Sequence, residues 1–179
     1  GGMREYRYSA LSSAGHTVTG IRAAQNSDQL AAALLEQGLV LLRSRPTLGS
    51  LGEIFSSAGR AGRRELREFT RHMATCLVAG IPAVSALADF QGHSEGDFAD
   101  VIADIRNDVS SGSALDVAFA RHPFVFDPIY LAMLAAGHTS GGLDRVFAEL
   151  VAYLEWKENL RAQTVQALIY PRSEEHTSE

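Results

Sequence analysis

Apolar residues recur at intervals of three and four positions through most of the chain after residue 63, and glycines or prolines interrupt the pattern. Phe69, Met73 and Leu77 fall on one face of a helix in this spacing, Gly80 stops that helix, and Pro82 opens the next. Such a pattern favours short amphipathic helices that each bury one face. We therefore predict that residues 63–171 form a helical bundle.

The interruptions divide this segment into six predicted helices. They cover residues 63–79, 82–91, 97–111, 113–119, 128–136 and about 142–168, with Asp97 and Asp127 as N-caps and Gly112 and Gly137 as stops. Six helices with short connections are typical of a bundle. The side chains expected on the buried faces are Leu66, Phe69, Met73, Ala74, Leu77, Val101, Ile102, Ile105, Leu143, Val146, Phe147, Leu150, Leu154 and Leu160. The two shorter helices carry the apolar residues Leu115, Val117, Ala118, Phe119, Ile129, Leu131, Met133 and Leu134.

The first 46 residues have a different pattern. Short alternating runs at residues 6–8 and 17–21 flank a glycine-centred turn, which predicts a hairpin. A helix capped by Ser27 and stopped by Gly38 follows, and then a strand at residues 39–42. Residues 47–62 are rich in glycine and serine, which is typical of a linker. The predicted fold class is mainly α, with a small ββαβ unit (1–46), a linker (47–62) and the six-helix bundle (63–171).

Composition narrows the function classes. A hydrophobic content of 46% supplies a core, and a net charge of −5 argues against nucleic-acid binding, which calls for a basic domain. The single Cys76 lies in an apolar helical stretch and is expected to be a buried structural thiol. No secretory signal opens the chain, and the longest uncharged run, residues 75–88, is short of the roughly 20 residues of a membrane span. We expect this chain to be soluble and cytoplasmic.

Two ordered blocks of residues resemble a known family, the type II secretion system protein F family. The first block is residues 69–82, which read FTRHMATCLVAGIP, and the second runs from His122-Pro123 through Ser140-Gly141 to Tyr170-Pro171. The first 46 residues also resemble the segment that precedes the bundle in full-length members. The resemblance covers residues 6–171.

The resemblance implies an inner-membrane platform, a scaffold and not an enzyme, which serves type II secretion or type IV pilus assembly. Its implied partners are the assembly ATPase, other platform components and pilins or pseudopilins, and a homodimer stays open. In the family, the tyrosine-proline pair precedes the first membrane helix, so the membrane would be reached through helices that this sequence lacks. Residues 172–179 resemble a translated sequencing adapter, which favours an artefactual tail, with a genuine polar tail as the alternative. The alternative hypothesis is that the chain is a free cytoplasmic helical protein-binding module.

Neither a metal site nor a nucleotide site emerges from the sequence. Glu95 matches a calcium-binding position suggested by the family, but its partner positions are Ala148 and Ala152, which carry no ligand oxygen. The acidic and histidine residues at 89–97 lack zinc spacing and are read as a solvated loop. The glycine-rich residues 136–142 lack the lysine of a phosphate-binding loop, so we expect a tight interhelical turn and no cofactor. His138 stands where the family usually has glutamate.

Two surfaces remain as candidate interfaces. Arg63, Arg67 and Arg71 recur one turn apart and form a basic stripe, and the simplest interpretation of this stripe is a solvated helix face. Beneath a membrane, such arginines attract anionic lipid headgroups or an acidic partner. Trp156 and Tyr170 suit the membrane interface, where amphipathic rings collect.

Overall fold

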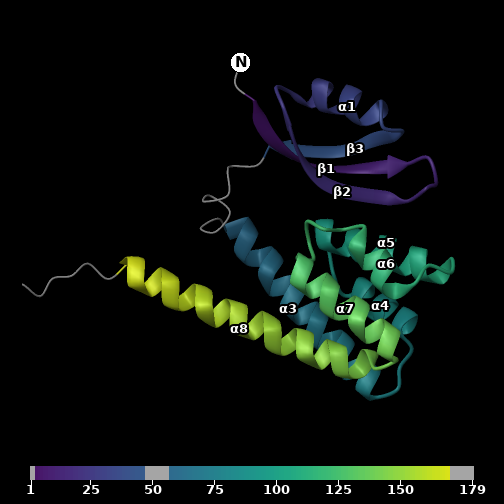
Figure 1. Cartoon of the computed structure of the whole chain (residues 1–179), viewed down its shortest axis with the longest axis vertical. Helices are drawn as coiled ribbons and strands as arrows, with labels where there is room; N and C mark the ends of the chain where they lie inside the picture. Colours follow the sequence, from purple (N-terminus) through teal and green to yellow (C-terminus); the bar gives the residue numbers. More distant parts are fainter. Residues whose placement is uncertain (1–2, 47–56, 170–179) are drawn as a thin grey trace, which may run out of the picture.

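The computed structural model describes residues 3–46 and 57–169. The N-terminal unit is a three-stranded antiparallel sheet with the strand order β2-β1-β3, and one helix, α1, covers one of its faces (Figure 1). The elements are β1 (Arg4–Ser12), β2 (Thr17–Ala24), α1 (Ser27–Leu35) and β3 (Leu39–Pro46). The predicted ββαβ order is confirmed, although each strand is longer than its sequence pattern suggested.

A small core holds this N-terminal unit together. Side chains from the strands meet two leucines of α1, so that one face of the sheet is closed; the buried members are Tyr6, Ala10, Ala24, Leu30 and Leu34. The predicted N-cap of α1 is wrong by one residue. The side chain of Asn26, and not that of Ser27, accepts the hydrogen bond from the Gln29 N–H.

The second unit is a bundle of six helices, as predicted. These are α3 (Ser57–Val78), α4 (Ala83–Gly92), α5 (Gly96–Ser110), α6 (Leu115–Ala120), α7 (Pro128–Ser140) and α8 (Leu143–Ile169). Helix α3 begins six residues before the predicted start, inside the segment expected to be a linker. Residues 47–56 lie outside the described part of the chain.

Several helix ends differ from the predicted ones. Glu95, and not Asp97, is the N-cap of α5, and Asp97 lies in the first turn. Gly137 does not stop α7, which continues to Ser140 and ends at Gly141 in a left-handed conformation with φ of 73°. Gly80 does end α3 as predicted, with φ of 81°.

The bundle core is rich in aromatic side chains. Phe119 and Phe126 lie 4.6 Å apart between ring centroids, and Tyr130 lies 5.2 Å from Phe126. The Tyr130 hydroxyl would be costly to bury alone, and it forms a 3.0 Å hydrogen bond with the Thr70 hydroxyl. Most side chains predicted to be buried are buried, but the prediction for Leu160 is wrong, because its side chain is 50% exposed.

Helix α8 sets the shape of the molecule. It packs along α3 and α7 with its first half and then runs past the rest of the bundle (Figure 1). Leu160 lies in this second half, where no other described helix covers it, which explains why its predicted burial is wrong. No helix within residues 3–46 and 57–169 has the length and apolar character needed to span a bilayer.

Candidate functional site

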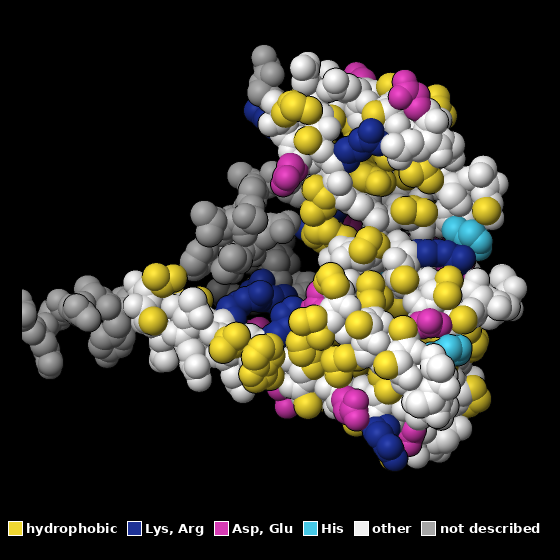
Figure 2. Space-filling model, in the orientation of Figure 1, with side chains coloured by type: hydrophobic (Ala, Val, Ile, Leu, Met, Phe, Trp, Pro, Cys, Tyr) yellow, Lys and Arg dark blue, Asp and Glu magenta, His cyan; other side chains and the backbone are white. Residues whose placement is uncertain are grey.

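The predicted basic stripe lies on α3 against α8, where each of its members faces an acid. Glu158 Oε2 is 2.9 Å from Arg67 Nη1 and 3.9 Å from Arg63 Nε. One turn earlier on α8, Glu155 Oε1 accepts a 2.8 Å hydrogen bond from Arg71 Nη2. Figure 2 shows Lys and Arg side chains gathered where α8 passes α3. The structure thus brings the three arginines together as one side of a seam of ion pairs.

The members of this seam differ in accessibility. The side chains of Arg63 and Arg67 are 25% exposed, whereas that of Arg71 is 55% exposed. Solvent-exposed ion pairs contribute only about 0–1 kcal/mol each, so a competing acidic group can displace Glu155 from Arg71 at little cost. Arg71 is therefore the arginine of the seam best placed to meet a partner, and that role remains a prediction.

An exposed aromatic and apolar surface begins on α8 next to this seam. Trp156 is 57% exposed, and its ring stacks on Tyr153 with 6.3 Å between centroids. Leu160 and Leu168 are exposed farther along the same helix. Exposed aromatic and leucine side chains on a projecting helix are typical of an interaction surface. Tyr170, the other predicted interface residue, lies outside the described residues.

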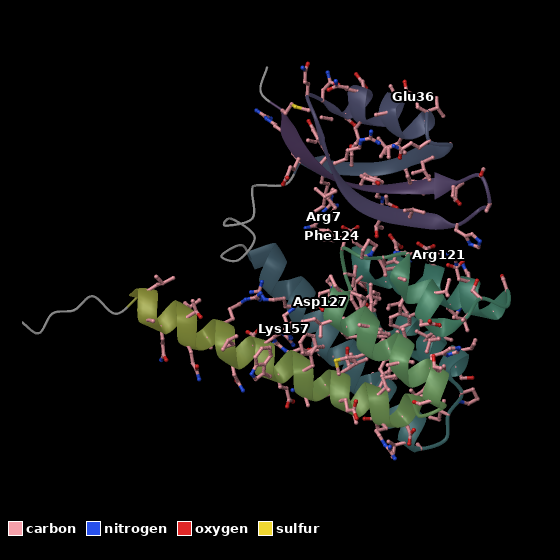
Figure 3. The ribbon with its side chains drawn as sticks, viewed as in Figure 1. Arg7, Glu36, Arg121, Phe124, Asp127 and Lys157 are labelled. Carbon is pink, nitrogen blue, oxygen red and sulfur yellow. The ribbon has the colours of Figure 1, made fainter. Side chains whose placement is uncertain are left out.

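Asp127 fixes this part of α8 to the start of α7. Its carboxylate accepts hydrogen bonds from the Tyr130 N–H (2.8 Å), the Tyr153 hydroxyl (3.0 Å) and Lys157 Nζ (2.7 Å), as Figure 3 shows for Lys157. Burial by itself would raise the pKa of Asp127, but these hydrogen bonds and the charge of Lys157 hold it below its ordinary value. Asp127 is thus both the predicted N-cap and an anchor for the aromatic pair on α8.

Glu95, the predicted calcium candidate, lies in an open crevice between α3 and the loop that follows α4. The crevice is lined by acidic and histidine side chains, and burial followed by the charges of Glu68 and Asp97 raises the pKa of Glu65 there. Within the described ranges, no three His, Cys, Asp or Glu side chains are placed to hold a metal ion. Ala148 and Ala152 lie exposed on α8 and offer no ligand atom.

Cys76, His72 and Asp89 come together beside this crevice, as in a nucleophilic site. One nitrogen, His72 Nε2, makes all the contacts: 2.9 Å to Ala86 O, 3.6 Å to Cys76 Sγ and 3.6 Å to Asp89 Oδ2. A relay needs one ring nitrogen for the nucleophile and the other for the carboxylate. Burial also raises the pKa of the Cys76 thiol, which disfavours the reactive thiolate. The Cys76 thiol is buried, as predicted.

The glycine-rich segment forms the tight interhelical turn that the sequence predicts. Gly141 supplies the left-handed residue, and the Gly142 carbonyl accepts the Val146 N–H at the start of α8. Gly137 packs so closely on α8 that a Cβ there would lie 1.8 Å from Val146 Cγ2. His138 Nε2 lies 3.9 Å from Asp116 Oδ1 on α6, so this histidine faces an acid.

Sequence reasoning missed two features of the surface. Aspartates at positions 97, 100, 104 and 108 share one side of α5 and face the N-terminal unit. Their three- and four-residue spacing was a readable signal. The junction of Asp127, Tyr153 and Lys157 had no such signal, because its members are brought together only by the packing of α7 on α8.

Comparison with known proteins gives two family matches that follow this division of the chain. Residues 69–174 match the type II secretion system (T2SS), protein F, and residues 3–44 match the type II secretion system protein F, N-terminal domain. The second match covers the sheet and α1, and the first covers the bundle from the second half of α3 onward.

The relatives include proteins named for type IV pilus assembly and proteins named for type II secretion. The chain is 33% identical over 171 residues to the type 4 fimbrial assembly protein PilC of Pseudomonas putida, covering 94% of this chain and 41% of the relative. It is 33% identical over 174 residues to the type II secretion system protein F of Xanthomonas campestris pv. campestris, covering 94% of this chain and 43% of the relative. The type IV pilus assembly protein PilC of Thermus thermophilus is 31% identical over 173 residues, with 94% and 42% covered. The chain therefore spans less than half the length of these relatives, and it belongs to the type II secretion system protein F family.

Proposed function

We propose that this chain is the N-terminal cytoplasmic part of an inner-membrane platform protein, which couples an assembly ATPase to the growth of a pilus or pseudopilus. One observation carries the proposal: both segments of the family match in the family's order, and the relatives are named for secretion and pilus assembly. Other platform components and pilins or pseudopilins are the further partners that follow from this role. A homodimer is compatible with it.

The side chains of the described residues support a mechanical role. The polar groups that converge, such as Asp127 with Lys157, hold helices together and leave no activated nucleophile open to solvent. The turn at Gly141 carries no lysine that would reach a phosphate. In a scaffold, chemistry is supplied by a partner, and the exposed surfaces of α3 and α8 are where contact is made.

The partner test is a titration of the purified chain against the ATPase encoded beside its gene, at low and moderate salt. We expect weak binding that declines as salt rises, because exposed charges such as Arg71 steer the encounter. Arg71→Glu should weaken binding by a further several-fold, whereas the matched control Arg145→Glu, at an exposed position on α8, should not. ATP turnover by the chain alone would contradict the scaffold role. Absence of binding at every salt would favour the free helical binding module.

The membrane contact is tested separately with anionic vesicles rich in phosphatidylglycerol. Trp156 is the only tryptophan, so its fluorescence reports on α8 directly. If this part of α8 meets the interface, vesicles should shift the emission to shorter wavelength and protect it from a soluble quencher. Leu160→Gln should reduce the shift, whereas Val117→Gln, an equally exposed apolar position on α6, should leave it intact. An emission spectrum indifferent to vesicles would remove Trp156 from the membrane interface.

A further inference from the structure

Four aspartates form a line along α5, which we call the acidic stripe: Asp97, Asp100, Asp104 and Asp108. Successive members are three or four residues apart, so their side chains lie on one side of the helix. Carboxylates at this spacing repel one another, and burial together with Asp108 and Asp100 raises the pKa of Asp104. A helix with such a stripe is destabilised unless something compensates the charge.

The end of β3 supplies two cations to the first members of the stripe. Arg43 Nη1 lies 2.9 Å from Asp97 Oδ1 and 3.3 Å from Asp100 Oδ2. Arg45 Nη1 lies 3.4 Å from Asp97 Oδ2. The side chains of all four residues are between 60% and 72% exposed. These contacts are therefore open to water and to salt.

The hairpin between β1 and β2 meets the other end of the stripe. His16 Nδ1 lies 2.8 Å from Asp108 Oδ1, and the side chain of Thr17 forms a hydrogen bond with Asp104. Asp108 is almost fully buried, and its second oxygen accepts a 2.6 Å hydrogen bond from Arg121 of the bundle itself. Every carboxylate of the stripe thus has a partner in the N-terminal unit.

Apolar contact contributes little to this docking. The buried apolar residues of the sheet and those of the bundle form two separate clusters within the described residues. Between them, the Arg7 guanidinium lies 3.6 Å above the centre of the Phe124 ring, and Figure 3 shows the two residues facing each other. On β3, Val40 and Leu42 remain about half exposed. The contact surface is therefore mainly polar, the kind across which domains move relative to one another.

We propose that the acidic stripe of α5 is a releasable docking surface, which the chain covers with Arg43, Arg45, His16 and Thr17 of its own N-terminal unit. The ion pairs of Arg43 and Arg45 are exposed, individually weak and screened by salt, so most of the charge pairing that favours docking is lost as salt rises. Docking also relieves the repulsion between the four carboxylates. Release uncovers a line of negative charge on α5 without disturbing either apolar core.

Pulsed electron paramagnetic resonance on the full chain measures the two arrangements directly. Spin labels are placed at Glu36→Cys, the C-cap residue of α1 away from the bundle (Figure 3), and at Asn159→Cys, on the exposed side of α8, in a Cys76→Ala background. At 0.01 M salt, where the screening length is about 30 Å, we expect one narrow distance distribution. At 1 M salt, where it is about 3 Å, the narrow component should fall several-fold and a broad one should replace it.

Charge reversals separate electrostatic docking from any other cause. Arg43→Glu with Arg45→Glu should abolish the narrow component at both salts, and adding Asp97→Arg with Asp100→Arg should restore it at low salt. Glu149→Arg, which reverses an exposed charge on α8 away from the stripe, should change nothing. Circular dichroism spectra confirm that each variant is folded. A narrow distribution that survives 1 M salt and the double reversal would overturn the proposal, as would a broad distribution in the unaltered chain at 0.01 M salt.

Discussion

Replacing Gly137 by alanine should destabilise the bundle, although alanine is the better helix former. The new Cβ would lie 1.8 Å from Val146 Cγ2 and 2.7 Å from Val146 Cβ, where ordinary contact begins near 3.4 Å. The first pair of atoms must therefore separate by about 1.6 Å, which α7 and α8 can achieve only by moving apart or by forcing Val146 from its rotamer. Overpacking of this kind costs about 1–3 kcal/mol, whereas alanine returns about 0.5–1 kcal/mol of helix propensity. We expect a net loss of about 1–2 kcal/mol.

Urea denaturation of the full chain, followed by far-ultraviolet circular dichroism, measures this loss as a lower midpoint at unchanged slope. Gly62→Ala is the matched control, because Gly62 is an exposed helical glycine of α3 and no atom of the described residues lies within 4 Å of its added Cβ. It should stabilise the chain by about 0.5–1 kcal/mol. Val146→Ala should cost less in the Gly137→Ala background than alone, since it removes the methyl group at 1.8 Å, which makes the worst clash. Equal stability of Gly137→Ala and the unaltered chain, or additive effects of the two changes, would refute the close contact.

Three further changes test other parts of the bundle by urea denaturation. Gly80→Ala should cost about 1 kcal/mol from backbone strain alone, because φ is +81° and none of the described residues crowds the site. An unchanged urea midpoint would contradict this. Asp127→Asn keeps an N-cap but loses the charge, so we expect the free energy of unfolding to fall by about 1.5 kcal/mol at neutral pH. Because the folded pKa of Asp127 is lowered, this difference from the unaltered chain should shrink as the pH falls below 3.8. A difference that stays the same at acidic pH would contradict the role of the charge. Burial lowers the pKa of His122 from 6.5 to about 4, so the free energy of unfolding should fall by up to about 3 kcal/mol as the pH drops from 6.5 toward 4. His122→Phe should make the free energy of unfolding less dependent on pH in this range. An unchanged pH dependence in the variant would rule out His122 as its source.

Sequence patterns predicted the elements better than their ends, for identifiable reasons. Asn26 and Ser27 are both strong N-caps, and only the geometry of the chain before α1 decides which side chain reaches the Gln29 N–H. Gly137 was interpreted as a helix stop because a glycine serves equally for a left-handed turn and for close approach. The structure assigns the turn to Gly141 and the close approach to Gly137.

For each candidate contact surface, the sequence revealed the residues of one helix but not the residues that they meet. The spacing of Arg63, Arg67 and Arg71 was visible in the sequence, but their partners Glu155 and Glu158 lie more than 80 residues away and meet them only when α8 packs on α3. The acidic stripe of α5 has the same character, since its partners come from a different unit. Periodicity within one helix indicates which charges share a face, and it carries no information about what that face meets.

The two sets of ion pairs differ in what lies beneath them, and this difference predicts which contact moves. The α3–α8 seam lies over the aromatic core around Phe69, so the burial of apolar surface holds the helices together and the ion pairs only orient them. The docking of the N-terminal unit on α5 has no shared apolar core among the described residues, so its charges supply most of the attraction. Raised salt should therefore separate the two units while the bundle unfolds at nearly the same temperature. Under the proposed platform role, the bundle is the rigid part that meets partners, and the N-terminal unit that covers the acidic stripe is the part that moves.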